Sequence, residues 1–210
     1  MEITIAMNEY MADTVDKGHP IPLREVEDSS LVAYAKTGDY SAFEELVKRY
    51  RNDVFGLSYH YLRNREEAWD ISQEVFIKAH RAIAKFRGDA SFKTWILRIT
   101  ANRCKDFFKK RKLKTVSVEE PAQLEQFKSP TASPDEALAS SELGHSIKKA
   151  LDTLSEKHKL AFVLRELDGQ SYEDMSKIME CSLGTVMSRL HHARKKLQQS
   201  LITMGVMEDR

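Results

Sequence analysis

Apolar residues recur at helical spacing through most of residues 28–201, and this periodicity is the strongest constraint on the fold. A helical segment over residues 70–85 is followed by a polar loop, 86–91, and by a second helical segment, 92–112. The apolar face of the second segment carries Phe92, Trp95, Ile96, Ile99, Phe107 and Phe108. The 210-residue sequence therefore predicts an all-α fold, with room for two small helical domains. We expect Trp95 to be a core residue, because it lies within this apolar face.

Charge is distributed unevenly along a chain whose formal net charge is only +1. Residues 98–114 hold eight basic side chains and one acidic one, whereas residues 1–30 hold seven acids and two bases. The polar face of the 92–112 segment carries Thr94, Arg98, Asn102, Lys105 and Lys109. A basic stripe on a half-apolar helix that follows a polar loop suits a nucleic-acid backbone and its bases.

Residues 1–27 are acidic and lack periodicity, which predicts a loosely ordered arm. The run Asp28-Ser-Ser is predicted to cap a short helix, 31–36, and Ser41 to open a capping box with Glu44 at the start of a long one. Asn64 is predicted to cap the helix that runs to Lys85. Residues 28–114 are therefore expected to form one helical domain with its own core.

Residues 115–140 are rich in proline, serine and acids, which predicts a flexible linker. The simplest interpretation is a disordered tether with no other role. The helical pattern returns in residues 141–210, with one helix carrying Leu143, Ile147, Ala150, Leu151 and Leu154. Further helices are predicted over 156–167, with Ser155 as its cap, over 172–179, with Ser171 as its cap, and from about residue 185. The last two helices and the glycine-containing turn between them predict a helix-turn-helix.

The last helix places Val186, Leu190, Ala193 and Leu197 toward the core. The side chains left to face outward near its start suit the edges of nucleobases, and the basic side chains beyond them suit phosphates. The predicted contacts are Thr185, Met187, Ser188, Arg189, His191, His192, Arg194 and Lys195. A solvated surface helix is the alternative. Neighbours on a helix point in different directions, so the pair His191 and His192 does not predict a metal site.

The sequence contains no nucleotide-binding loop, catalytic constellation or cofactor motif, so neither an enzyme nor a bound cofactor is expected. Cys104 and Cys181 lack metal-ligand spacing and are expected to be buried thiols, with a redox pair as the alternative. An apolar run long enough to span a membrane and a signal-peptide pattern are both lacking. A cytoplasmic location without membrane association is therefore expected.

Two blocks of sequence resemble one protein family. The run Leu164–Asp174 with Gly184–Arg194 is similar to the C-terminal promoter-binding domain of bacterial extracytoplasmic-function (ECF) sigma factors. The runs Asp70–Phe76, Phe86–Trp95 and Arg98–Asn102 resemble the N-terminal domain of the same family. The two blocks occur in family order and are separated by a linker of similar character, so the resemblance covers roughly residues 28–200.

The resemblance implies roles for individual residues. In the family, the helix equivalent to 70–85 binds the clamp helices of the largest subunit of core RNA polymerase, which assigns that contact to Asp70, Gln73, Glu74 and Lys78. The loop and the following helix capture unpaired bases of the -10 element on the non-template strand, and Asn102 matches a position that contacts a flipped base. The resemblance assigns the capture of the -10 strand to Phe86, Arg87, Gly88, Asp89, Ser91, Thr94, Arg98, Asn102, Lys105 and Lys109. The helix-turn-helix reads the -35 element as duplex, and an unidentified anti-sigma factor is expected as a further partner.

The sequence departs from the family pattern at Met187 and His192, where many relatives carry basic residues, so its -35 contacts are less cationic. Two other classes of function fit the sequence less well. A stand-alone helix-turn-helix regulator with an N-terminal sensing domain leaves the Asp70–Asn102 block unexplained. An enzyme acting on nucleic acid needs clustered carboxylates or metal ligands near the basic helix, and Asp89 and Asp106 are too few.

Overall fold

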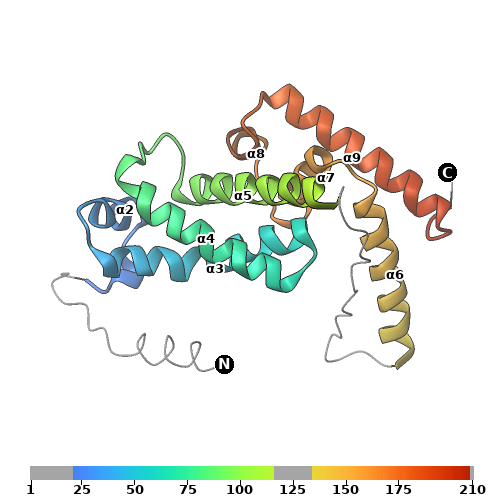
Figure 1. The fold of residues 1–210 in the computed structure, drawn as a ribbon, viewed down its shortest axis with the longest axis horizontal. Helices are drawn as coiled ribbons and strands as arrows, with labels where there is room; N and C mark the ends of the chain where they lie inside the picture. Colours follow the sequence, from blue (N-terminus) through green and yellow to red (C-terminus); the bar gives the residue numbers. More distant parts are fainter. Residues whose placement is uncertain (1–20, 116–133, 209–210) are drawn as a thin grey trace.

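The structure is a computed structural model that describes residues 21–115 and 134–208. Every regular element within these ranges is helical, which confirms the predicted all-α fold (Figure 1). The N-terminal region contains η1 (Leu23–Glu25), α2 (Asp28–Lys36), α3 (Tyr40–Leu62), α4 (Arg65–Ala82), η2 (Ile83–Lys85) and α5 (Phe92–Thr115). The C-terminal region contains α6 (Pro134–Asp152), α7 (Glu156–Phe162), η3 (Val163–Leu167), α8 (Tyr172–Met179) and α9 (Leu183–Thr203).

Two predicted segments fall largely outside the described residues: positions 1–20 of the arm and positions 116–133 of the linker. The prediction of a loosely ordered arm fails for residues 21–27. Leu23 and Val26 are buried against the N-terminal core, and Arg49 of α3 donates to the Leu23 and Arg24 carbonyl oxygens, each at 3.0 Å. Two apolar side chains and one guanidinium therefore attach this segment despite its lack of periodicity. At the other end of the linker, α6 begins at Pro134, earlier than Ser140.

The helix caps agree with the sequence at some positions and differ at others. Asn64 accepts a hydrogen bond from the Glu67 amide at 3.0 Å, as predicted. For α3 the prediction of Ser41 is wrong, because the cap is Asp39, whose carboxylate accepts from the Ala42 amide at 3.1 Å. For α2 the cap position is Glu27, since the Asp28 carboxylate is bound by Arg49 at 2.8 Å and by the Tyr50 hydroxyl.

Helix α5 lies between the other N-terminal helices and the C-terminal region (Figure 1). Its inner face is buried with the apolar residues of α2, α3 and α4, and Trp95 is only 8% exposed, which confirms its assignment to the core. The same cluster continues into α7, α8 and α9, through residues such as Leu160, Met175 and Leu190. The two regions therefore share one core, whereas the sequence predicted that residues 28–114 have a core of their own.

The C-terminal region has a second, smaller cluster between α6 and α9, formed by Ala150, Leu151, Leu154, Ala193 and Leu197. Two residues of the expected α6 stripe, Leu143 and Ile147, are instead 48% and 40% exposed. The predicted helix 156–167 is divided, because its last turn is a π-helix in which the Asp168 amide donates to the Val163 carbonyl at 3.0 Å. Cys104 is buried as expected, and burial raises its pKa to about 12, whereas Cys181 is only half-buried.

Candidate nucleic-acid interface

The loop 86–91 is held in place at both of its ends. At its start, Lys36 donates to the Phe86 carbonyl at 2.9 Å, and the Phe86 ring packs against Trp95 with 5.0 Å between ring centroids. Gly88 adopts φ = +81°, a left-handed conformation that glycine takes without steric cost. At the end of the loop, the Ser91 hydroxyl accepts from the Thr94 amide at 3.1 Å and so caps α5.

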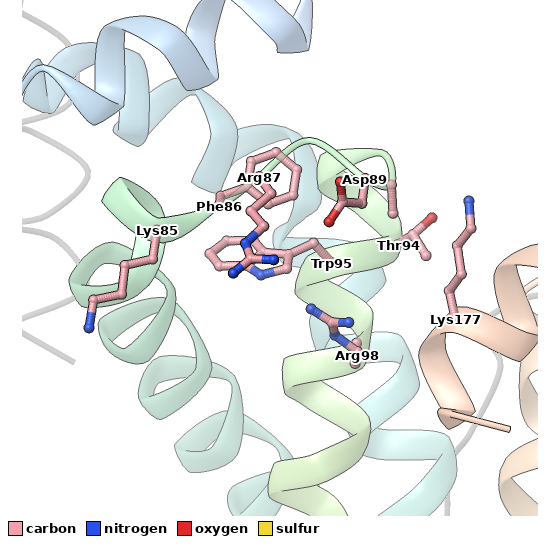
Figure 2. Close-up of a pocket in the computed structure, with 9 residues that line it drawn as sticks. Lys85, Phe86, Arg87, Asp89, Thr94, Trp95, Arg98 and Lys177 are labelled. Carbon is pink, nitrogen blue, oxygen red and sulfur yellow. The ribbon is translucent and has the colours of Figure 1, made fainter.

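A pocket of about 320 Å³ lies between this loop and the first turns of α5 (Figure 2). Four of its side chains are cationic and one is a carboxylate, while Phe86 and Trp95 supply an aromatic wall. Lys177 reaches it from α8, and Lys85 extends away from the other labelled side chains (Figure 2). The lining residues are Lys85, Phe86, Arg87, Asp89, Ala90, Thr94, Trp95, Arg98 and Lys177. Cations around an aromatic wall suit a nucleobase with its phosphates.

The structure brings together five residues of the predicted -10 set at this pocket: Phe86, Arg87, Asp89, Thr94 and Arg98. Gly88 and Ser91 belong to the same loop. Asn102, Lys105 and Lys109 lie further along α5, outside the pocket lining. Asn102 is half-buried, and its side-chain oxygen accepts a hydrogen bond from Lys105 at 3.3 Å.

Thr94 differs from its neighbours because it is only 3% exposed. Its hydroxyl donates to the Asp174 carboxylate of α8 at 2.9 Å and also lies 2.8 Å from the Ser91 hydroxyl. The first turn of α5 is therefore covered by the C-terminal region. Sequence reasoning missed Asp174 and Lys177, because no local pattern shows which helices meet across the two regions.

The outer face of α4 carries the predicted polymerase contacts. Asp70, Gln73, Glu74 and Lys78 are all exposed, whereas Ile71, Val75 and Ala79 on the inner face are buried. Glu74 is bound by Arg103 of α5, which ties its carboxylate to the basic helix.

Two large apolar residues share this outer face and were missed by the sequence prediction. Trp69 is 56% exposed and Ile77 is 52% exposed. They are eight residues apart with Gln73 midway between them, so all three follow one side of the helix. The Trp69 ring packs edge-on against Phe55, with ring centroids 6.3 Å apart. Their spacing on an otherwise polar face was a readable signal for an interface.

The helix-turn-helix is formed by α8 and α9. Ser171 and Ser182 cap the two helices, accepting from the Asp174 amide at 3.0 Å and the Thr185 amide at 3.3 Å. The inward-facing set of α9 is buried as predicted. Of the predicted -35 residues, Thr185 and Arg189 are half-buried, and the exposed ones are Met187, Ser188, His191, His192, Arg194 and Lys195.

Both arginines of α9 form hydrogen bonds within the chain. Arg194 donates to the Glu166 carboxylate through two nitrogens, at 3.0 and 2.5 Å. Arg189 donates to the Cys181 sulfur at 3.5 Å. The His192 ring stacks on His158 of α7 with 5.9 Å between centroids, and burial together with His192 lowers the pKa of His158. The ion pair between Arg194 and Glu166 further reduces the cationic character of the helix.

The described residues contain no cluster of three or more His, Cys, Asp or Glu side chains that could hold a metal ion. Within the same ranges, no helix combines the length and the apolar character needed to cross a membrane.

Comparison with known proteins decides the family. Residues 32–114 match the family model described as Sigma-70 region 2, and residues 145–197 match Sigma-70, region 4. The chain is 36% identical over 183 residues to the ECF RNA polymerase sigma-E factor of Escherichia coli K12, covering 84% of this chain and 95% of the relative. This chain belongs to the ECF family of sigma factors.

A second relative of this sigma factor is the RNA polymerase sigma-H factor of Pseudomonas aeruginosa, which is 35% identical over 185 residues and covers 85% of this chain and 96% of the relative. As a member of the family, the chain directs RNA polymerase to promoters and is not itself an enzyme. The alternative of a stand-alone regulator is therefore set aside.

Two solved structures show the same fold. One is CnrH in complex with the cytosolic domain of CnrY, with a TM-score of 0.62 and 22% identity over 84% of this chain and 97% of that chain. The other is the sigma factor RpoE of Bartonella quintana in complex with the anti-sigma factor NepR, with a TM-score of 0.61 and 23% identity over 80% of this chain and 98% of that chain.

Proposed function

We propose that this sigma factor divides promoter recognition among three surfaces. The outer face of α4 binds the clamp region of the largest subunit of core RNA polymerase. The pocket at loop 86–91, together with α5, captures the opened -10 non-template strand, and the start of α9 reads the -35 element as duplex. The observation that carries the proposal is the part of the pocket that region 2 supplies, in which the cations of Arg87 and Arg98 lie beside the aromatic wall of Phe86 and Trp95.

The domain division follows the same surfaces. Because Leu23 and Val26 are attached to the N-terminal core and α6 begins at Pro134, we propose that the domain for polymerase and the -10 element begins at residue 21 and ends at residue 114, and that the domain for the -35 element begins at residue 134. The residues between them form the linker. The two family matches, 32–114 and 145–197, fall within the two proposed domains.

Strand opening on this surface needs no nucleotide hydrolysis. A protein that binds the opened strand and not the duplex shifts the equilibrium by the difference between the two affinities. Unstacking costs on the order of 1–2 kcal/mol per base-pair step. Stacking of one base on an aromatic wall contributes about 1–3 kcal/mol, and cations such as Arg87 and Arg98 add phosphate contacts. Polymerase holds the protein and the promoter in a geometry that allows the stacking and phosphate contacts to form together.

The partners follow from the family and the fold. We propose that the factor acts in the cytoplasm, where it binds polymerase, and that an anti-sigma factor controls it. The two solved structures described above are both complexes with a second protein, and in one of them a sigma factor is bound to an anti-sigma factor. Such a partner would cover the surfaces that meet polymerase or DNA.

Run-off transcription with sigma-free core polymerase tests the proposal. Added protein should yield transcripts that depend on the promoter's -10 and -35 elements. Tight DNA binding without polymerase, and no transcript, would refute it.

Asn102→Ala tests the -10 role within the same assay. It should reduce permanganate reactivity of the opened -10 region by about tenfold, while core binding stays unchanged. The matched control is Lys110→Ala, an exposed residue of α5 outside the predicted set. Normal reactivity in the Asn102 variant would remove this residue from the site.

A further inference from the structure

The recognition helix presents apolar side chains where DNA would lie. Leu183 is 40% exposed and Met187 is 51% exposed. They are four residues apart in the first turns of α9, so they lie side by side on one face. The N-terminal turns of a recognition helix are the part that meets base edges in the major groove.

The chemistry of the groove identifies what such a pair can read. Thymine alone presents a methyl group in the major groove, and that methyl is contacted by apolar side chains. The neighbouring arginines are engaged elsewhere, Arg189 with the Cys181 sulfur and Arg194 with Glu166. We propose that Leu183 and Met187 recognise the 5-methyl groups of thymines in the -35 element. This proposal rests on the proposed role of α9.

Replacing -35 thymines by deoxyuridine removes only the methyl groups. Binding of the holoenzyme should weaken by about three- to fourfold for each methyl contacted, the value expected for one buried methyl group. The Leu183→Ser/Met187→Ser variant should bind the normal promoter more weakly and be insensitive to deoxyuridine. Met204→Ser, at the far end of α9, is the matched control.

The assignment would be overturned if deoxyuridine did not weaken binding of the wild-type holoenzyme, or if it weakened binding of the double variant equally. A scrambled -35 element separates this failure from failure of the proposed function, because loss of all -35 dependence contradicts the role of α9 itself.

A second inference rests on independent contacts, those between the two regions. Helix α8 packs against α5 beside the pocket, as Figures 1 and 2 show. The Thr94 hydroxyl donates to Asp174 at 2.9 Å, and the Arg98 guanidinium lies 4.0 Å from the Glu180 carboxylate. Thr94 and Arg98, the α5 residues of these two pairs, belong to the predicted -10 surface. Further along, the Tyr61 hydroxyl donates to the Glu156 carbonyl at 3.3 Å.

The contact is built into the local structure of α8. The Asp174 carboxylate accepts from the Ser171 hydroxyl at 2.7 Å, which orients it while its other oxygen accepts from Thr94. Glu180 ends the helix at φ = 54°, a left-handed conformation uncommon for residues other than glycine. Its carboxylate lies across from Arg98.

The same surface cannot serve α8 and DNA at once. Thr94 is 3% exposed in this arrangement, and Lys177 occupies one side of the pocket. We infer that α8 acts as an intramolecular cover of the -10 surface in the free factor. Polymerase and promoter bind only the state in which α8 has moved away from α5, and so they shift the equilibrium toward that state. This inference rests on the proposed -10 role of the pocket.

The variant Asp174→Ala/Glu180→Gly tests the cover in the full-length free chain. It removes the two carboxylates that contact Thr94 and Arg98, and glycine suits the left-handed position of Glu180. The Glu173→Ala/Glu208→Ala variant loses the same charge from exposed positions outside the contact. Fluorescence anisotropy then measures binding of a labelled -10 non-template oligonucleotide, and small-angle scattering measures the radius of gyration.

The cover predicts that the first variant binds the oligonucleotide about five- to tenfold more tightly than the control variant and has a larger radius of gyration. Equal DNA affinity in the two variants overturns the inference, whether or not the radius changes. Holoenzyme run-off should be the same in both variants. If run-off transcription depends on the -10 element while the two free variants bind the oligonucleotide equally well, the inference of a cover is wrong and the proposed function is retained.

Discussion

The Asp168 carboxylate lies where the two regions meet and carries an unfavourable charge there. Its Oδ2 atom is buried and has no hydrogen-bond partner among the described residues. Burial and, to a smaller extent, Asp53 of α3 raise the pKa of Asp168 to about 6, while Lys93 of α5 opposes the shift. Lys93 is itself paired with Asp53 at 2.6 Å. The folded chain therefore favours the protonated acid.

Asp168 makes the stability of the folded chain depend on pH. Between the ordinary aspartate pKa and about 6, the folded chain binds more protons than the unfolded chain, so this residue lowers stability as pH rises. Asp168→Asn should raise the free energy of unfolding by about 1–2 kcal/mol at pH 7 and leave it nearly unchanged near pH 4. Denaturant unfolding at the two pH values measures this, with Glu173→Gln as the exposed control. A gain that is larger at pH 4 would contradict the assignment.

Residue identity predicted some of the site and not the rest. Trp95 was assigned to the core by its position in an apolar stripe, and it is buried while also lining the pocket. Thr94 was expected to face DNA, because the local pattern leaves it on the polar side of α5. Its burial depends on Asp174, eighty residues away, and helical periodicity carries no information about such a contact.

Individual helices were predicted well where the sequence supplies both a stripe and a cap. Asn64 before α4 met both conditions, and its side chain makes the expected bond. The start of α3 was misplaced because Asp39 and Ser41 are both good capping residues, and only the backbone geometry selects the aspartate. The π-turn at 163–167 has no equivalent signal in the periodicity.

The caps allow a quantitative prediction. Asn64→Ala removes the bond to the Glu67 amide and should lower the free energy of unfolding by about 1 kcal/mol. Ser155→Ala is the matched comparison, because Ser155 occupies the cap position of α7 without a side-chain bond to the helix. Thermal or denaturant unfolding should show a clearly smaller loss for the serine variant. Equal losses would mean that the Asn64 bond contributes nothing specific.

The outer face of α4 gives a prediction about binding. Ile77→Ser exchanges an exposed apolar side chain on that face for a polar one, so folding should be unaffected. Its dissociation constant from core polymerase should rise by about tenfold, because apolar anchors at an interface centre carry a large share of the energy. Arg51→Ser on α3, exposed and outside this face, should bind normally. Unchanged affinity of the Ile77 variant would place the polymerase contact elsewhere.

At the scale of the whole molecule, the sequence identified two helical blocks but not their packing. The core runs continuously from α2 to α9, and α8 lies on the first turns of α5. Among the residues that meet there are Arg98 and Glu180, whose charged side chains the local sequence pattern predicts to be solvent-exposed. The division into blocks follows from periodicity, whereas their contact depends on three-dimensional complementarity.

We propose that the pocket at loop 86–91 and the adjoining face of α5 take up the opened -10 strand. Titrating the holoenzyme against labelled single-stranded -10 oligonucleotides measures this directly, by fluorescence anisotropy. The non-template strand should bind at least about tenfold more tightly than the template strand, and Arg98→Ala and Asn102→Ala should each weaken it by about tenfold. Equal affinity for the two strands, together with unchanged binding by both variants, would contradict the claim.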